Sequence, residues 1–256
     1  MKESERQKAI AKKGYFKSDQ AFTIDEFDFI KKNIDYKYTN VLKEKDIPKE
    51  DIEKHFEREF KLSHYHEISS FINHALTWPK PARILPENFV NWFLSTKYIK
   101  SLALEYGELE ITDEEALGYP NIYWRITRPN QSRDVGPLHR DSWFWEIYKL
   151  NGKKFPDFER LKSWISINVE PGKNGLLVVN ESHKNKELEW ETIKKDCKIK
   201  PSLKTKISAE DLTLLKTSNN NVVTFDDDLV HGGSENLGKT TRVSIEFTVF
   251  LKDFKS

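Results

Sequence analysis

The spacing of the apolar residues changes near residue 118, and this change limits the folds open to the chain. Before it, apolar residues recur every three or four positions, which is typical of helices. After it, short runs alternate apolar and polar residues between turn residues, which is typical of strands. The strand-like runs are 121–129, 161–171, 174–183, 221–227 and 240–251. Because these runs come late and have no long helices between them, they predict an antiparallel sandwich or jelly roll.

The part up to about residue 117 is predicted to be mostly helical and to buttress one sheet. Helical spacing is found at 23–34, 47–60, 66–76 and 86–107. Thr23 is a candidate N-cap, with Glu26 three residues later to complete a capping box. The mildly basic start, 2–17, is expected to be solvated. The polar stretch 184–215 is expected to be part helix and part loop.

Size and composition favour a single domain. The 256 residues suffice for one sizeable core, with about 118–252 forming the sheets. The charges of 42 Lys and Arg and 41 Asp and Glu nearly cancel. The chain therefore has no large positive electrostatic field to hold a nucleic acid. The single cysteine, Cys197, excludes an internal disulfide and a Cys-based zinc site. No apolar run approaches the roughly 20 residues of a membrane span. Without a signal-peptide pattern, a cytoplasmic location is expected.

Two histidines and an aspartate are candidate ligands for one metal ion. His139 and Asp141 stand two apart, and in a strand such residues point the same way. His231 ends an apolar run and precedes Gly232 and Gly233, which let other groups approach closely. Two imidazoles and one carboxylate form the facial ligand set of non-haem Fe(II) oxygenases, although zinc can use the same ligands.

A guanidinium and a hydroxyl are predicted to face the same cavity. One face of the last strand is apolar and the other carries Arg242, Ser244, Glu246 and Thr248. A turn at 234–239 is expected to bring this strand back beside the one that ends at His231. A planar guanidinium with a neighbouring hydroxyl suits a carboxylate ligand.

These residues together resemble the motif of the Fe(II)/2-oxoglutarate-dependent dioxygenases. The set is His139, Asp141, His231, Arg242 and Ser244. The phytanoyl-CoA dioxygenase-type branch is the most similar, because "NGLLVVNESHK" at 174–184 resembles its NG-x-L-x-V-x-PGSHK stretch. Asn180 and Glu181 replace the usual Pro-Gly, so the turn differs. The similarity covers about 85–250 and implies a mainly β fold, a double-stranded β-helix (jelly roll) core buttressed by N-terminal α-helices.

The resemblance also implies an activity. His139, Asp141 and His231 would hold Fe(II), and Arg242 and Ser244 would bind the far carboxylate of 2-oxoglutarate. With O2, 2-oxoglutarate would yield succinate and CO2 while an unactivated C–H bond of the substrate is hydroxylated. The carboxylate at Asp141 argues against a halogenating variant. The expected substrate is a small polar metabolite, amino-acid-like, sugar-like or other; the oligomeric state stays open.

Further residues are predicted to shape the cavity. Candidates for substrate contacts are Trp143, Trp145, Arg128 and Arg133, with core packing and solvated loop positions as the alternatives. Trp164 and Asn168 share a face of their strand and are predicted to line the 2-oxoglutarate pocket. Asp226–Asp228 are expected to form a solvated turn, and His183 to be hydrogen-bonded in its own turn.

Two other functions use the same residues differently. A cupin-like metal-binding isomerase, or a non-catalytic jelly-roll binding protein, needs the metal ligands alone. A helical interaction protein would carry the His-x-Asp pair by chance. Arg242 and Ser244 favour the oxygenase, because a cupin has no need of an anchor for 2-oxoglutarate.

Overall fold

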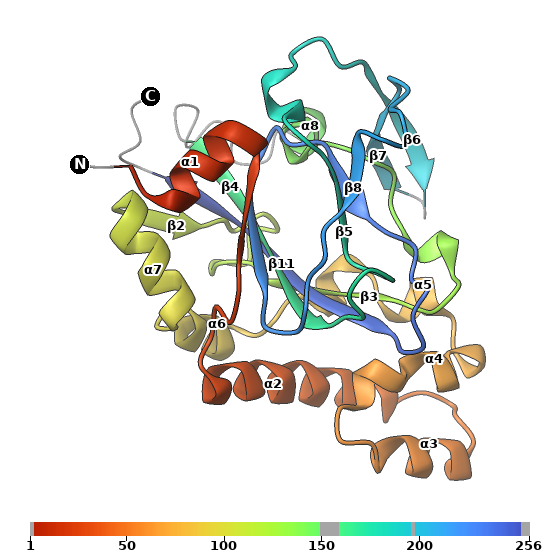
Figure 1. The fold of residues 1–256 in the computed structure, drawn as a ribbon. Coiled ribbons are helices and arrows are strands. Elements are labelled where there is room, and N and C mark those ends of the chain that lie inside the picture. Colours follow the sequence, from red (N-terminus) through yellow and green to blue (C-terminus); the bar gives the residue numbers. More distant parts are fainter. Residues whose placement is uncertain (1–2, 149–158, 196–197, 252–256) are drawn as a thin grey trace.

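The computed structural model describes residues 3–148, 159–195 and 198–251; Cys197, for which no role is predicted, lies outside them. Two antiparallel sheets pack against each other, and helices cover the outer face of the larger sheet (Figure 1). The predicted sandwich with N-terminal helices is therefore confirmed. No described helix combines the length and the apolar character that crossing a bilayer requires.

The strands form two facing sheets and a separate hairpin. They are β1 (Tyr15–Ser18), β2 (Leu109–Ile111), β3 (Tyr123–Thr127), β4 (Glu159–Asn168), β5 (Leu176–Val179), β6 (Trp190–Lys195), β7 (Lys198–Leu203), β8 (Leu212–Leu214), β9 (Val222–Asp226), β10 (His231–Gly233) and β11 (Arg242–Leu251). The larger sheet has the order β1-β9-β4-β11-β2, with β3 also paired to β11. The smaller sheet has the order β10-β5-β8, and β6 pairs with β7.

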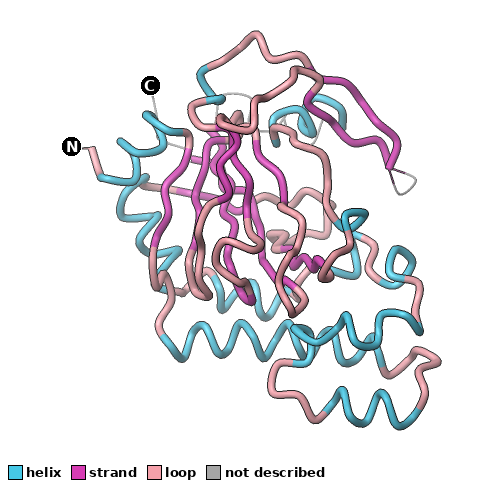
Figure 2. Tube along the Cα trace, turned by 45° about the vertical axis from the view of Figure 1, so that its right-hand side comes forward, coloured by secondary structure: helices cyan, strands magenta, loops and turns pink. Residues whose placement is uncertain are grey.

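Most helices precede β3 in the sequence. Figure 2 shows most of the helices (cyan) beside and below the strands (magenta). The α-helices are α1 (Glu5–Lys13), α2 (Ile24–Leu42), α3 (Lys49–Phe56), α4 (Tyr65–Ile68), α5 (His74–Thr77), α6 (Glu87–Phe93), α7 (Lys97–Tyr106) and α8 (Asp141–Tyr148). The 3-10 turns are η1 (Lys61–His64), η2 (Ser69–Phe71), η3 (Lys80–Arg83), η4 (Ser132–Asp134) and η5 (Ser182–Lys184). The predicted capping box of α2 is confirmed: Thr23 Oγ1 accepts from the Glu26 amide, and Glu26 Oε2 accepts from the Thr23 amide.

The helices bury their apolar faces against the larger sheet. Ile34 of α2, Phe93 of α6 and Leu102 of α7 join one cluster with Ile245 and Phe247 of β11. Apolar and polar residues alternate along β11 as expected. The apolar face packs against the helices, and the polar face lines a cavity between the sheets. The helices thus leave one face of β11 free for a site.

The N-terminal segment is part of the sheet, so the expectation of a solvated start was wrong. Residues Tyr15–Ser18 form β1, which pairs with β9 and covers the edge that β9 would otherwise expose. The His183 imidazole Nε2 lies 3.2 Å from the carbonyl oxygen of Ala11, at the end of α1. His183 therefore contacts the N-terminal helix, and the prediction that it is hydrogen-bonded in its own turn was wrong.

Three other expectations about elements are corrected. In the stretch 184–215, the described residues form β6, β7 and β8 and include no α-helix, and Pro201 within β7 could not lie inside a helix. The run 66–76 breaks into α4, η2 and α5, because Asn73 caps a new turn by accepting from the Leu76 amide. The run 86–107 divides into α6 and α7 at Leu94–Thr96.

Candidate metal centre and cavity

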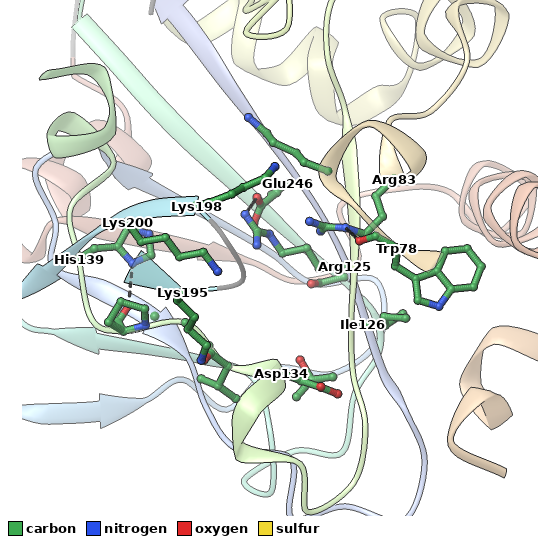
Figure 3. A pocket seen from close by; sticks show the side chains of 18 of the residues that line it. Trp78, Arg83, Arg125, Ile126, Asp134, His139, Lys195, Lys198, Lys200 and Glu246 are labelled. Atoms are coloured by element: carbon green, nitrogen blue, oxygen red, sulfur yellow. Dashed lines mark hydrogen bonds and ion pairs between the residues drawn. The ribbon is translucent and has the colours of Figure 1, made fainter. Parts of the chain in front are cut away.

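A cavity of about 1300 Å³ opens between the two sheets. Its floor comes from β4 and β11, one wall from β10 and the start of α8, and its mouth from η4 and the β6–β7 hairpin. Figure 3 shows His139 on one side of this cavity and Arg125, Glu246 and Trp78 further across it. Most of the site candidates therefore lie around one cavity.

The three predicted metal ligands converge in this cavity. His139 and His231 form a β-bridge, each amide donating to the other's carbonyl oxygen over 2.9 Å. Their Nε2 atoms lie 3.7 and 3.8 Å from the two carboxylate oxygens of Asp141. One ligand atom from each residue lies within 4.8 Å of the others, which is close enough to share one ion. The convergence was predicted from the sequence.

The local geometry around Asp141 differs from the prediction. His139 is extended, but Asp141 begins α8, so the alternation does not continue past the His-x-Asp pair. On the helix, Phe144, Trp145 and Tyr148 recur at helical spacing from Asp141 and line the cavity with it. A short aromatic run fits the spacing of a strand and that of a helix equally well, and here tertiary packing stabilises the helix.

Trp143 is a correction that follows from this helix. Its ring stacks on Trp190 of β6, with centroids 5.3 Å apart, in a cluster with Val179 and Val230. It does not belong to the cavity lining, so it is a packing residue. Trp145 does line the cavity, and it also packs against Phe250.

The hydrogen bonds of the two imidazoles use Nδ1 and leave Nε2 of each ring available to bind a metal. His139 Nδ1 lies 2.8 Å from the Pro137 carbonyl oxygen, and His231 Nδ1 lies 2.9 Å from that of Leu229. A carbonyl oxygen only accepts, so each Nδ1 carries the hydrogen and each Nε2 presents a lone pair. Burial outweighs the charge of Asp141 and lowers the pKa of His231 to about 4. The imidazole is therefore neutral at neutral pH, as a ligand must be.

The carboxylate is ionised and lacks a hydrogen-bond donor for one oxygen. Burial alone would raise the pKa of Asp141, but Lys162, His231 and His139 together hold it well below its usual range. Asp141 Oδ2 is buried and has no hydrogen-bond partner among the described residues. An ionised carboxylate with one oxygen that lacks a donor, close to two imidazole lone pairs, fits a divalent cation.

Arg242 is buried in the lining of the cavity and held by hydrogen bonds. Its Nη1 donates to the carbonyl oxygens of Gly175 (2.7 Å) and Ser234 (3.0 Å), and its Nη2 donates to Thr127 Oγ1 (2.7 Å). A guanidinium has five N–H groups, so two stay available for a ligand. The Ser244 Oγ, on the same face of β11, is buried without a hydrogen-bond partner among the described residues. Both side chains line the cavity as predicted.

The route that brings Arg242 to the metal ligands was predicted wrongly. β10 pairs with β5 in the smaller sheet, whereas β11 pairs with β3 and β4 in the larger one. The two strands therefore face each other across the cavity and are not neighbours in one sheet. Gly233 permits this approach, because a Cβ there would lie 2.7 Å from Arg242 Nη2.

Of the two predicted pocket residues on β4, only Trp164 lines the cavity. Opposite β11, Val243 pairs with Asn168 and Ser244 pairs with Ser166, so β4 carries an extra residue in a bulge. The alternation counted from Trp164 fails beyond it. The Asn168 amide instead donates to Thr240 Oγ1 and the Thr241 carbonyl oxygen. The prediction that Asn168 lines the pocket was wrong.

The two arginine candidates both border the cavity. Arg128 makes a bidentate pair with Asp134, with bonds of 2.8 and 2.7 Å, so its charge is already matched. Arg133 is exposed and donates to the Gln131 side chain over 3.2 Å. Arg133 is the better placed of the two to meet a ligand.

Sequence reasoning missed a set of charges on the cavity floor. Lys162 of β4 is buried, and its Nζ lies 3.6 Å from Asp141 Oδ2 and 3.3 Å from Thr248 Oγ1. Glu246 of β11 pairs with Arg125, and Arg125 and Lys162 outweigh burial to lower the pKa of Glu246 to about 2. Lys162 lies within an otherwise apolar strand, and this sequence feature could have indicated the buried charges.

The acidic triplet before His231 is also more buried than expected. Asp227 is buried, and its Oδ2 accepts from Arg160 over 2.7 Å. Burial raises the pKa of Asp227 to about 7 despite this arginine. The prediction of a solvated turn was wrong for Asp227.

Comparison with known protein families identifies the family to which the chain belongs. The family model described as phytanoyl-CoA dioxygenase (PhyH) matches residues 14–244. The chain belongs to the phytanoyl-CoA dioxygenase family. The resemblance found in the sequence is confirmed, and family membership makes the chain a dioxygenase-type protein. No curated protein matches the sequence.

Solved structures share the fold of this family member at low identity. EvdO2 from Micromonospora carbonacea var. aurantiaca, complexed with 2-oxoglutarate, has a TM-score of 0.62 at 13% identity, over 98% of this chain and 92% of that one. EctD from S. alaskensis, with 2-oxoglutarate and 5-hydroxyectoine, has a TM-score of 0.56 at 16% identity, over 96% and 76%. These similarities confirm the predicted jelly roll, with sheets that do not close into a barrel.

Proposed function

We propose that this protein is an Fe(II)- and 2-oxoglutarate-dependent oxygenase that hydroxylates an unactivated C–H bond of a small polar metabolite, with release of succinate and CO2. One observation carries the proposal: three side chains able to bind one metal ion and an anchored guanidinium line the same cavity, with His231 in the smaller sheet and Arg242 in the larger one. The structures of EvdO2 and EctD with 2-oxoglutarate, and of EctD with bound Fe, support it.

The metal is assigned to His139 Nε2, His231 Nε2 and Asp141. A three-residue set of this kind leaves coordination positions open, and Fe(II) there would supply the oxygen chemistry that amino-acid side chains lack. The protein's part is to keep both imidazoles oriented through Nδ1 and to keep the carboxylate ionised beside Lys162.

The cosubstrate is assigned to Arg242 and Ser244. The remaining N–H groups of the guanidinium and the Ser244 hydroxyl can donate to the distal carboxylate of 2-oxoglutarate. The carbonyl oxygens of Gly175 and Ser234 fix the guanidinium before a ligand arrives, which lowers the entropy cost of binding. Trp164 forms the apolar wall beside this anchor and limits the access of water.

The decisive experiment measures succinate formed from 2-oxoglutarate after anaerobic loading with Fe(II) and admission of O2. Asp141→Ala is expected to abolish turnover and metal retention. Asp211→Ala is the matched control, because Asp211 is exposed and bonded only to Ser208. A wild-type protein that retains metal but forms no succinate would favour the cupin-like alternative.

A second measurement tests the anchor by itself. Arg242→Ala should weaken 2-oxoglutarate binding by about 3–5 kcal/mol, because the ligand's carboxylate would be buried without its partner. Binding is read from the visible charge-transfer band of the anaerobic Fe(II) complex, and metal content is measured in parallel. Unchanged 2-oxoglutarate affinity in a folded, metal-loaded variant would refute the assignment of Arg242.

A further inference from the structure

The β6–β7 hairpin is held at the mouth of the cavity from two sides. The Tyr148 hydroxyl of α8 donates to the carbonyl oxygen of Ile199 in β7 over 2.5 Å. The Lys195 ammonium of β6 donates to the carbonyl oxygen of Val135, just after η4. These contacts fix the hairpin so that one of its faces looks into the cavity.

That face of the hairpin concentrates positive charge. Lys195 lies directly opposite Lys198, and Lys200 lies two residues further along the same face. All three side chains line the cavity. Figure 3 shows Lys198 and Lys200 between His139 and Glu246, and Lys195 on the side of Asp134. Like charges directly opposite each other destabilise a strand pair. An anion bound among the three ammonium groups would offset that cost.

The carboxylates of the cavity are already paired with other cations. The pairs are Lys80 with Glu114 and Glu115, Arg128 with Asp134, Arg125 with Glu246, and Lys162 with Asp141. The mouth gains one more cation from Arg133, two residues before the Val135 that Lys195 contacts. The cavity therefore carries an excess of positive charge on the side of the hairpin.

An aromatic surface faces this charge. Phe144 and Tyr148 stack on α8, with ring planes 11° apart, and Phe144 meets His139 edge-on at 5.2 Å between centroids. Both aromatic side chains line the cavity next to the metal ligands. A substrate held at the lysines would place its apolar part against these rings and close to the metal.

We infer that the substrate carries an anionic group, a carboxylate or a phosphate, which Lys195, Lys198, Lys200 and Arg133 bind at the cavity mouth while its apolar part lies against Phe144. The inference rests on the proposed function and narrows its polar substrate to an acidic one. The anion site uses other residues than that of 2-oxoglutarate, which is assigned to Arg242 and Ser244 of β11.

The test measures binding without turnover. Benzoate, phenyl phosphate and neutral benzamide are titrated calorimetrically into protein loaded with Mn(II) and saturating 2-oxoglutarate under nitrogen. Both anions should bind, with an affinity that falls as salt is added, and benzamide should give no detectable heat. The tighter anion identifies the group. Binding of benzamide as tightly as the anions would overturn the inference.

Charge reversal locates the site. The double variant Lys198→Glu with Lys200→Glu should weaken anion binding by roughly tenfold or more, because two attractions become repulsions. The control is Lys194→Glu with Lys206→Glu, which changes the net charge equally at exposed positions outside the cavity. Both variants should keep wild-type affinity for 2-oxoglutarate. Unchanged anion binding in the first variant, or an equal loss in the control, would refute the site.

The outcomes separate this inference from the proposed function. If anion binding depends on the lysines but no succinate forms with O2, the oxygenase proposal fails and the anion site stands. If succinate forms while neither anion binds, the oxygenase proposal stands and the anion site fails.

Discussion

Gly233 determines how closely β10 can approach the guanidinium of Arg242. A Cβ at Gly233 would lie 2.7 Å from Arg242 Nη2, which is closer than such atoms can come. We therefore expect Gly233→Ala to displace the guanidinium and to weaken 2-oxoglutarate binding by roughly tenfold, since a shift of this size breaks one charged hydrogen bond. Metal affinity should be unchanged, because Arg242 contacts no metal ligand.

Gly136→Ala provides the matched control for this prediction. Gly136 also lines the cavity, but a Cβ there meets nothing within 4 Å. Titration of both variants with 2-oxoglutarate, followed by the charge-transfer band, separates a local clash from a general effect of added methyl groups. Equal affinities in the two variants would show that Gly233 does not set the position of Arg242.

At the scale of elements, α8 has two functions on two faces. Trp143 packs against Trp190 in a buried cluster, whereas Phe144 faces the cavity. Trp143→Ala should cost about 3–5 kcal/mol of unfolding free energy. Phe144→Ala should cost much less and should instead lower substrate-stimulated succinate release. Urea denaturation measures the loss of stability, and the turnover assay measures succinate release. A larger loss of stability in Phe144→Ala than in Trp143→Ala would contradict this division of the helix.

The contact between α2 and α3 predicts a pH dependence. His55 Nε2 lies 2.8 Å from the Tyr38 hydroxyl, and His55 Nδ1 is buried without a hydrogen-bond partner among the described residues. Burial lowers the pKa of His55 to about 4. The unfolded chain therefore binds a proton at higher pH than the folded one, and the free energy of unfolding falls as the pH drops from about 6.5 towards 4.

His55→Gln should remove this contribution. The difference in unfolding free energy between the wild type and the variant should shift by roughly 2 kcal/mol between pH 7 and pH 5, in favour of the variant at the lower pH. Denaturant titrations at both values measure it, and the other titrating groups cancel in the difference. A difference that stays constant with pH would mean that the buried imidazole titrates normally.

At the scale of the whole molecule, the proposed metal ligands connect the two halves of the sandwich. His231 belongs to the smaller sheet, while Asp141 is paired with Lys162 of the larger one. A divalent ion that binds only the folded chain should raise the unfolding free energy by about 2.7 kcal/mol at a hundredfold excess over its Kd.

This linkage is measured with Mn(II) in thermal unfolding, with and without a chelator. The stabilisation should disappear in His231→Ala. The anchor variant Arg242→Ala should keep it, because the ion does not contact the guanidinium. Equal stabilisation of His231→Ala and the wild type would place the ion elsewhere.

The sequence by itself determined the class of fold and singled out the proposed metal ligands and the proposed anchor. The alternation of β11 separates a core face from a cavity face without reference to any partner, because side chains of a strand alternate in every context. The His-x-Asp pair, the distal His231 and Arg242 could be found because each residue type is chemically specific. The capping box at Thr23 is equally local.

Only the tertiary structure decided which side chains share the cavity. Local alternation cannot show that β10 and β11 lie in opposite sheets, that a bulge removes Asn168 from the pocket, or that α8 begins at Asp141. The three lysines of the hairpin and Lys162 acquire their roles from strands that pair far from the motif in sequence. Pairing, register and the burial of a charge depend on contacts between distant segments, and the energy of those contacts outweighs local preference.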